Sequence, residues 1–377
     1  MKRNFALILT IALVISLLAG CAGTTVVIGN CDCPYKDGVL TPAPQETTPA
    51  EGTEATTPNA ETEATIPAEG AVLTGLSVST KISDSTSATT DAEGAATYDI
   101  TLAAVLVDEN GVILACTIDS IPATVKFDAT GNITSDPAMA VPTKNEMGES
   151  YGMVAWGGAI AEWDAQVAAV SRYAVGKTVD ELKNGDIDMT TGKAKDGTDL
   201  ATSATIYLAG YVYAIEAAVN NAQNLGAQAG DELVLSTLNT VKSSTGATAD
   251  KDGTAQLDCD IVALTKKDGV ITSCNIDSVQ AKIAFNAAGQ ITTDLSAAVQ
   301  TKNQLGEAYG MVAWGGAKAE WNAQAAAYAA YVTGKTAEEV AGIAITEATK
   351  PADGTDLAAS VTIAIGGFQA LIAKAMQ

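Results

Sequence analysis

The 377-residue chain contains no histidine, and this absence excludes several kinds of chemistry at once. Ser-His-Asp and Cys-His nucleophilic sites, histidine-ligated metals and histidine pH switches all need an imidazole. Basic residues are also scarce: 21 Lys and Arg stand against 44 Asp and Glu, and the formal net charge is −23. A chain with this charge repels phosphate, which argues against nucleic acid as a partner and against a peripheral role on anionic membranes.

Two short motifs invite a ligand-binding interpretation that their spacing does not support. Val175-Gly-Lys-Thr178 resembles the end of a phosphate-binding loop, but Ser171 occupies the position where such a loop has glycine. Asp186-Ile-Asp188 and Asp196-Gly-Thr-Asp199 lack the spacing with which a calcium loop wraps its ion. We therefore predict a helix end at the first motif, solvated loops at the others, and no metal site.

The N-terminus has the parts of an export signal. Lys2 and Arg3 precede an apolar run from Phe5 to Leu18, which is too short to remain as a membrane span. Leu18-Ala-Gly-Cys21 then resembles the bacterial lipoprotein signal, and the resemblance implies that residues 1–20 are removed and that Cys21 is lipidated. Acyl chains on Cys21 would anchor the chain to the extracytoplasmic face of the cell membrane, because each buried methylene contributes roughly 0.8 kcal/mol. An ordinary cleaved signal with an incidental cysteine is the alternative.

A tract rich in Thr, Pro, Glu and Ala fills most of the chain over residues 21–70. It lacks apolar periodicity, its glutamates repel one another, and its prolines favour extended conformations. We predict a disordered stalk that separates the folded part from the membrane.

One sixteen-residue segment occurs twice in the chain. Tyr151–Gln166 reads YGMVAWGGAIAEWDAQ and Tyr309–Gln324 reads YGMVAWGGAKAEWNAQ, with fourteen identical positions. Flanking residues recur at similar spacing, among them Cys116-x-x-Asp119 as Cys274-x-x-Asp277. The sequence therefore predicts one domain present in two tandem copies, over residues 71–226 and 227–377.

Each copy predicts the same order of elements. Alternating apolar residues joined by glycine-containing turns predict strands, at 98–107, 112–119 and 124–127 and at 259–265, 270–277 and 282–285. Helical periodicity predicts a long amphipathic helix ended by Gly176 or Gly334 and then a closing helix, at about 148–175 and 206–222 and at about 306–333 and 363–376. Hairpins followed by helices favour an α+β fold with a small antiparallel sheet in each copy.

All four tryptophans lie in the repeated segment, at Trp156, Trp163, Trp314 and Trp321. Within each copy they are seven residues apart, so a continuous helix would place both on one face. Core packing is the simpler interpretation of that face, and an aromatic wall for a planar ligand, such as a flavin or a sugar, is the alternative. Glu162 and Glu320 are expected to be exposed and have no evident acid–base partner. This favours an electron carrier or a binding protein over an enzyme with its own active site.

A second repeated motif precedes each closing helix, as Asp199-Leu-Ala-Thr202-Ser-Ala-Thr205 and Asp356-Leu-Ala-Ala-Ser-Val-Thr362. Together with the hairpin before it and the Ala-rich helix after it, the motif resembles the small FMN-binding domain family of exported redox lipoproteins and sodium-pumping quinone reductases. The family motif is Asp-x-x-Thr/Ser-Gly-Ala-Thr/Ser, and a separate flavin transferase joins FMN to its last residue through a phosphoester bond. The resemblance implies FMN on Thr205 and Thr362, with Asp199, Asp356 and Thr202 in the binding motif and the four tryptophans near the flavin ring.

The motif departs from the family pattern at the glycine. Ser203 stands there in the first copy, and Ala359, Ser360 and Val361 all differ in the second. The glycine matters because it lets backbone approach a phosphate closely and permits positive φ.

Three hypotheses follow for this membrane-anchored lipoprotein. It carries FMN and relays electrons between redox partners outside the cell, with the cofactor supplying the chemistry. Alternatively it is a binding module without flavin that holds a small planar ligand or a partner protein. The third hypothesis is a structural surface protein without ligand.

Overall fold

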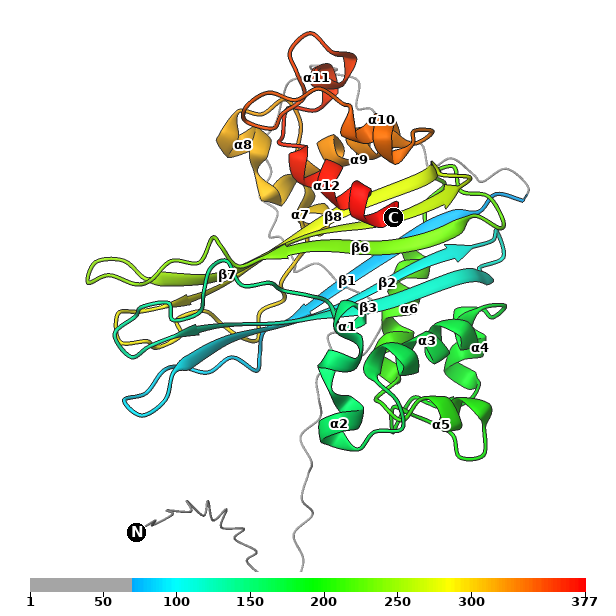
Figure 1. Cartoon of the computed structure of the whole chain (residues 1–377), viewed down its shortest axis with the longest axis horizontal. Coiled ribbons are helices and arrows are strands. Elements are labelled where there is room, and N and C mark those ends of the chain that lie inside the picture. The colour runs from blue at the N-terminus through cyan, green and yellow to red at the C-terminus, as the bar shows by residue number, and fades with distance from the viewer. Residues whose placement is uncertain (1–69) are drawn as a thin grey trace, which may run out of the picture. The chain divides into compact units, whose positions relative to one another are not determined.

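The structure is a computed structural model that describes residues 70–377, and Figure 1 shows their arrangement. The predicted signal, Cys21 and the stalk lie outside the described residues. The described part combines helices with antiparallel sheets, so the prediction of an α+β fold is confirmed. None of its helices has the length and apolar character needed to cross a membrane.

Two three-stranded antiparallel sheets lie at the centre, in the orders β1-β2-β3 and β6-β7-β8. The strands are β1 (Leu73–Lys81), β2 (Gly94–Val107), β3 (Ile113–Phe127), β6 (Glu232–Thr240), β7 (Gly253–Lys267) and β8 (Val270–Phe285). The hairpins β2–β3 and β7–β8 confirm the two predicted hairpins. The separate strands predicted at 124–127 and 282–285 are wrong, because β3 and β8 continue through them. Pro122 does not stop β3, since this strand lies at the edge of its sheet.

Helices follow each sheet in the same order in both halves of the chain. After β3 come α1 (Lys144–Met147), the 3₁₀ helix η1 (Gly148–Tyr151), α2 (Met153–Gly157), α3 (Trp163–Ala174), α4 (Val179–Asn184), α5 (Asp199–Ser203) and α6 (Ala209–Asn220). After β8 come α7 (Lys302–Leu305), η2 (Gly306–Tyr309), α8 (Met311–Gly315), α9 (Trp321–Val332), α10 (Ala337–Ala341), α11 (Asp356–Ser360) and α12 (Gly366–Ala375). The first half also has a small ribbon of β4 (Ile187–Asp188) and β5 (Lys193–Ala194).

The long helices predicted over 148–175 and 306–333 are wrong. Gly152 and Gly158 have φ of +82° and +63°, and this left-handed backbone ends one helical segment before the next begins. Only the last part of each predicted helix, α3 and α9, is long and regular. The helix ends predicted at Gly176 and Gly334 are confirmed, since these residues have φ of +80° and +84° just after α3 and α9.

The two faces of each central strand have different partners. On β2, the side chains of Tyr98, Ile100 and Leu102 belong to a core shared with the second sheet. Val105 and Val107, on the other face, pack beneath the helices of their own half. The sheets therefore stack face to face, with α3 and α6 on the outer side of one and α9 and α12 on the outer side of the other.

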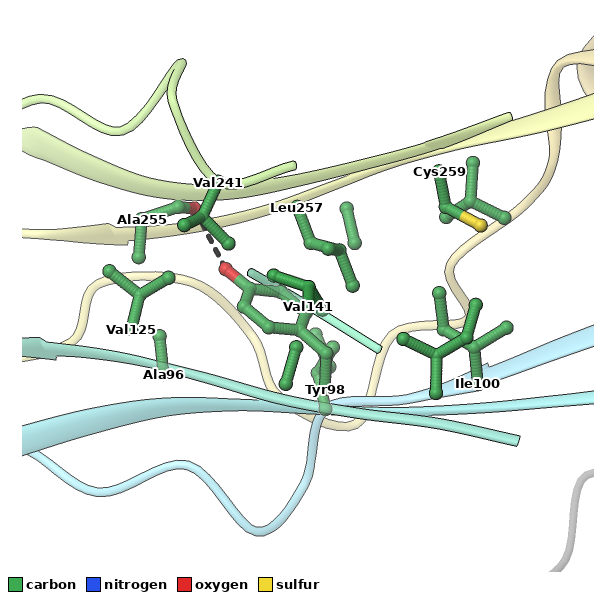
Figure 2. Packing of buried hydrophobic residues seen from close by; sticks show 14 of the residues in the cluster. Ala96, Tyr98, Ile100, Val125, Val141, Val241, Ala255, Leu257 and Cys259 are labelled. Atoms are coloured by element: carbon green, nitrogen blue, oxygen red, sulfur yellow. Dashed lines mark hydrogen bonds between the residues drawn. The ribbon is translucent and has the colours of Figure 1, made fainter. Parts of the chain in front are cut away.

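The shared core joins the two halves into one compact unit. Figure 2 shows Tyr98, which is fully buried and donates its hydroxyl hydrogen to the carbonyl oxygen of Ala255 at 2.8 Å. At the end of the sheets, the rings of Phe127 and Phe285 stack with centroids 4.1 Å apart. Each half thus contributes one sheet to a single hydrophobic core.

Loops at this end of the sheets interlock through backbone hydrogen bonds. Ala88 N–H donates to the carbonyl oxygen of Gly289 at 2.8 Å, and Ala247 N–H donates to that of Gly131 at 2.7 Å. Both glycines have positive φ, and a Cβ on Gly131 would lie 2.8 Å from the Cβ of Ala247. Glycine is therefore required on steric and conformational grounds at these contacts.

Candidate functional site

The tryptophans of each half lie in different environments. Trp156 is 90% exposed on α2 and Trp314 is 89% exposed on α8, whereas Trp163 and Trp321 are 3% and 5% exposed at the start of α3 and α9. The prediction that each pair shares one helical face is therefore wrong, because the chain turns at the glycines between them. We call residues 152–162 and 310–320 the first and second tryptophan loops.

A glutamate closes each tryptophan loop on itself. The Glu162 carboxylate accepts hydrogen bonds from the N–H groups of Met153 at 2.8 Å and Val154 at 3.0 Å, and so caps the N-terminus of α2. In the second loop Glu320 bonds Met311 and Val312 at 2.8 and 2.9 Å. The prediction that these glutamates are exposed is wrong, since both are partly buried and both serve as caps. A five-residue helix such as α2 has no stability of its own, so the cap holds the loop in shape.

The exposed indole rests on a glycine. A Cβ built on Gly152 would lie 2.2 Å from Cδ1 of Trp156, and the same distance separates a Cβ on Gly310 from Cδ1 of Trp314. Both glycines also have φ near +80°. Glycine is therefore the residue that admits the ring at this place, and the rest of each ring remains open to solvent.

The exposed Val-Ala-Trp-Gly-Gly segment is the same in the two tryptophan loops, although the buried core has changed. Val-Ala-Trp-Gly-Gly recurs unaltered at 154–158 and 312–316, where every residue is exposed. In the shared core, by contrast, Tyr98 opposite Ala123 corresponds to Leu257 opposite Ala281. Packing preserves buried residues and gives no reason to keep an exposed tryptophan. The loops therefore carry the strongest signal for a function within this chain.

The buried tryptophan anchors the loop to the body of its half. Trp163 Nε1 donates to the hydroxyl oxygen of Tyr211 at 2.9 Å, and burial raises the pKa of Tyr211 to about 12. Lys144 Nζ lies 5.3 Å from the Trp163 ring centroid and 5.1 Å from that of Tyr151, within the range of cation–π attraction. In the second half Lys302 lies over Trp321 and Tyr309 at 4.9 and 5.5 Å. These contacts fix the chain on both sides of the exposed helix.

A buried carboxylate holds the start of the same segment. Asp277 Oδ1 accepts hydrogen bonds from the N–H groups of Ser278 and Asn303, at 2.7 and 3.1 Å, and burial raises the pKa of Asp277 to about 6. In the first half Asp119 bonds Asn145 N–H at 3.1 Å, and burial raises its pKa as well. Both aspartates therefore bind the first turn of the helix that leads into the tryptophan loop.

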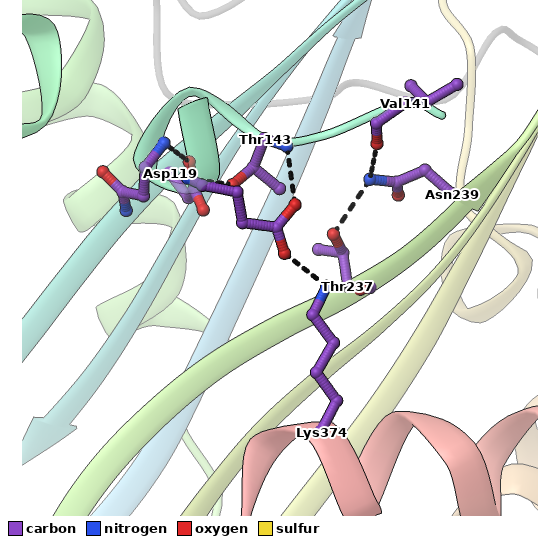
Figure 3. A network of polar contacts seen from close by, with 8 residues as sticks. Asp119, Val141, Thr143, Thr237, Asn239 and Lys374 are labelled. Atoms are coloured by element: carbon purple, nitrogen blue, oxygen red, sulfur yellow. Dashed lines mark hydrogen bonds and ion pairs between the residues drawn. The ribbon is translucent and has the colours of Figure 1, made fainter. Parts of the chain in front are cut away.

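Among residues 70–377, only the first half has an ion pair at this point, which Figure 3 shows beside Asp119. Glu146 in α1 pairs with Lys374 of α12, whose Nζ also donates to the carbonyl oxygen of Thr237 at 2.7 Å. Nearby, Asn239 Nδ2 donates to the carbonyl oxygen of Val141 at 3.0 Å. The second half thus braces the segment that carries the first tryptophan loop.

The threonines of the FMN-like motif are held by a glutamine. The Oε1 atom of Gln166, which is fully buried in α3, accepts from the N–H groups of Thr205 at 2.8 Å and Ile206 at 3.3 Å and from the Thr205 hydroxyl at 3.2 Å. Gln324 bonds Thr362 and Ile363 in the same way, at 2.7 to 3.2 Å. Sequence reasoning missed this role, although both glutamines close the repeated segment.

The Thr205 site meets some of the requirements of a phosphoester-linked FMN and fails others. Thr205 is exposed, so its hydroxyl is accessible for attachment, whereas the neighbouring N–H groups that would cradle a phosphate already bond Gln166. Ser203 is the last residue of a helix and not among those with positive φ, so its backbone does not need glycine. Asp199 and Asp356 are exposed at the starts of α5 and α11, and Thr202 bonds the Asp199 carbonyl oxygen at 2.7 Å. The site admits attachment but offers no free backbone donor from residues 205 and 206.

Other reactive groups in residues 70–377 are inert or dispersed. Burial raises the pKa of the Cys116 and Cys274 thiols to about 12, and that of Cys259 is also raised. Within this range no group of three Cys, Asp or Glu residues is arranged to hold a metal ion. A groove of about 480 Å³ beside α3 is lined in part by Cys116, Ser171 and Arg172 and reaches neither tryptophan loop.

Comparisons of the chain with protein families, curated proteins and solved structures find no match. The resemblance to the FMN-binding family therefore rests on the residues of the motif and on the order of elements alone.

Proposed function

We propose that this chain is a membrane-anchored extracytoplasmic lipoprotein that binds glycans through its two tryptophan loops. The observation that carries the proposal is the presence of two almost fully exposed indoles, on loops that share the exposed Val-Ala-Trp-Gly-Gly segment and the same glutamate cap. The proposed anchor at Cys21 would place the loops outside the cell, next to envelope polysaccharide.

The size of each exposed surface favours a small ligand over a folded partner. A tryptophan side chain offers at most about 250 Å², whereas a stable protein interface buries about 800 Å² on each partner. Beside Trp156, only Val154 and Ile160 are large exposed apolar residues of the first loop. Together these side chains match a few sugar rings and fall well short of a protein interface.

The chemistry of the loop favours a sugar among small ligands. The C–H groups on one face of a pyranose carry partial positive charge and pack against the electron-rich face of an indole. Exposed Glu149 and Glu307 precede the two loops and provide acceptors for sugar hydroxyls. The formal charge of −23 repels polyanions such as nucleic acid. An uncharged polymer such as a neutral glycan experiences no such repulsion.

Isothermal titration of the mature chain with a tetramer of N-acetylglucosamine tests the proposal. We expect two sites with dissociation constants near the millimolar range, because each site is open and small. Trp156→Ala and Trp314→Ala should each remove one site, and the double variant should bind nothing. Val175→Ala, which trims an exposed apolar side chain outside the loops, is the matched control. Absence of binding by the native chain at millimolar sugar would refute the proposal.

A second proposal keeps FMN as a covalent group on Thr205 and Thr362, added by a flavin transferase. The supporting observation is a threonine hydroxyl held in the same way on a buried glutamine in both halves. Bound FMN would supply electron transfer, and the chain would relay electrons between redox partners. Intact mass and a visible spectrum after co-expression with a transferase test it, with Thr205→Ala/Thr362→Ala as the control. An unmodified mass would count against this proposal and leave glycan binding untouched.

A further inference from the structure

The two tryptophan loops have the same backbone dihedral angles at the glycines that begin and end their short helices. Gly152 and Gly310 have φ/ψ of 82°/24° and 80°/25°. The glycines that end the short helices, Gly158 and Gly316, have 63°/25° and 61°/24°. Equivalent residues therefore occupy equivalent positions around the two exposed indoles.

One residue differs between the two loops, and it is exposed. Ile160 of the first loop is 56% exposed, and Lys318, also exposed, takes its place in the second. Hydrogen bonds hold this position on both sides. Ala159 N–H donates to the Met153 carbonyl oxygen at 3.1 Å, Ala317 N–H donates to that of Met311 at 3.0 Å, and the capping glutamate follows two residues after position 160 or 318. The side chain at this position is thus presented from the same braced loop as the indole.

The ammonium of Lys318 forms no ion pair in the part of the chain that the structure describes. The nearest acid in sequence, Glu320, has its two carboxylate oxygens bonded to the N–H groups of Met311 and Val312. In a strongly acidic chain, an exposed positive charge on the same short loop as an exposed indole gives an anionic ligand a point of attraction.

We propose that the second tryptophan loop prefers glycans that carry a carboxylate, whereas the first loop does not distinguish them from uncharged ones. The proposal rests on the glycan-binding function above. Lys318 pairs with the sugar carboxylate while the indole of Trp314 packs on the sugar ring, and Ile160 gives the first loop an apolar contact in the same place. The preference has the size of an exposed ion pair, about threefold in dissociation constant, and declines with added salt.

The test uses single-site variants of the mature chain and two matched sugars. Trp156→Ala leaves the second loop and Trp314→Ala leaves the first. The probes are an alternating tetramer of N-acetylglucosamine and N-acetylmuramic acid, which carries carboxylates, and the same tetramer with its carboxylates converted to carboxamides. We expect the Trp156→Ala protein to bind the acid about threefold more tightly than the amide at low salt. The Trp314→Ala protein should bind the two equally.

Exchange of the differing residue completes the test. Lys318→Ile in the Trp156→Ala protein should abolish the preference, and Ile160→Lys in the Trp314→Ala protein should create it. Both positions are exposed, so unchanged thermal melting is expected and serves as the folding control. Equal affinity of the second loop for acid and amide, or a preference that survives Lys318→Ile, overturns this inference and leaves glycan binding standing. Failure of both probes and of the N-acetylglucosamine tetramer to bind any of the proteins overturns the proposed function and this inference with it.

Discussion

Removal of the Glu162 carboxylate tests whether the cap controls the first tryptophan loop. In Glu162→Ala, the N–H groups of Met153 and Val154 lose acceptors at 2.8 and 3.0 Å. Loss of a helix cap costs about 0.5–2 kcal/mol, and two charge-assisted bonds place this case near 2 kcal/mol. Because a factor of ten in an equilibrium corresponds to about 1.4 kcal/mol, the local opening equilibrium should rise about thirtyfold. The global melting temperature should change little, since Met153 alone among residues 152–162 packs against the core of this half.

Amide hydrogen exchange measures this opening directly. We expect protection of the Met153 and Val154 amides to fall about thirtyfold in Glu162→Ala, while the amides of β2 and β3 stay unchanged. Glu149→Ala, a loss of an exposed carboxylate just before the loop, is the matched control and should have no effect. Glu162→Gln should give an intermediate result, because a carboxamide keeps only one acceptor oxygen. Unchanged protection at both amides in Glu162→Ala would show that the carboxylate does not hold the loop.

Three further predictions concern the rest of the molecule. Gly289→Ala should lower the free energy of unfolding by about 2 kcal/mol or more, since the new Cβ would lie 2.5 Å from the Asp128 carbonyl oxygen. Gly111→Ala, with φ of +75° and open space around it, should cost only about 1 kcal/mol, and equal losses in urea titrations would contradict the steric argument. The pKa of Asp277 is raised to about 6, so its protonation contributes stability that is complete below its unfolded pKa near 3.8 and is lost as pH rises through 6. Relative to Asp277→Asn, the native chain should therefore lose on the order of 1–3 kcal/mol between pH 4 and 7, and parallel pH profiles would refute the assignment. Cys259 and Cys274, which are buried, should resist alkylation at pH 8 until the chain unfolds, because burial also raises the pKa of each thiol. Peptide mapping that finds them labelled in the native chain would show that they are accessible.

Local signals in the sequence predicted the fold class and the hairpins, but not the path of the repeated segment. The turn at Gly111 and the alternation of β2 are short-range features, and they lead directly to the β2–β3 hairpin. Trp156 and Trp163 satisfy helical spacing equally well in a continuous helix or in two separate ones. The Gly157-Gly158 pair was the sequence signal for a break in the predicted helix. The prediction of one long helix gave more weight to the periodicity of the apolar residues.

Contacts between distant residues explain the remaining differences. Alternation along β2 shows that Tyr98 and Ile100 share a face, but it does not show that a second sheet, which begins at Glu232, covers that face. Thr205 was identified from its motif, whereas its partner Gln166 lies 39 residues earlier in a different helix. The recurrence of this glutamine at the end of both repeated segments was the one signal that could have revealed the pair.

The face-to-face stacking of the sheets determines how the two tryptophan loops can be used together. Each loop follows the strands of its own sheet, on the outer side that the helices cover, and the shared core keeps these sides turned away from each other; in Figure 1, α2 lies below the sheets and α8 above them. A single flat surface therefore cannot occupy both indoles of one molecule. If both loops are filled, their ligands belong to two separate strands, and the chain becomes a cross-link between them. With the proposed anchor at Cys21, this cross-link would also be tethered to the membrane.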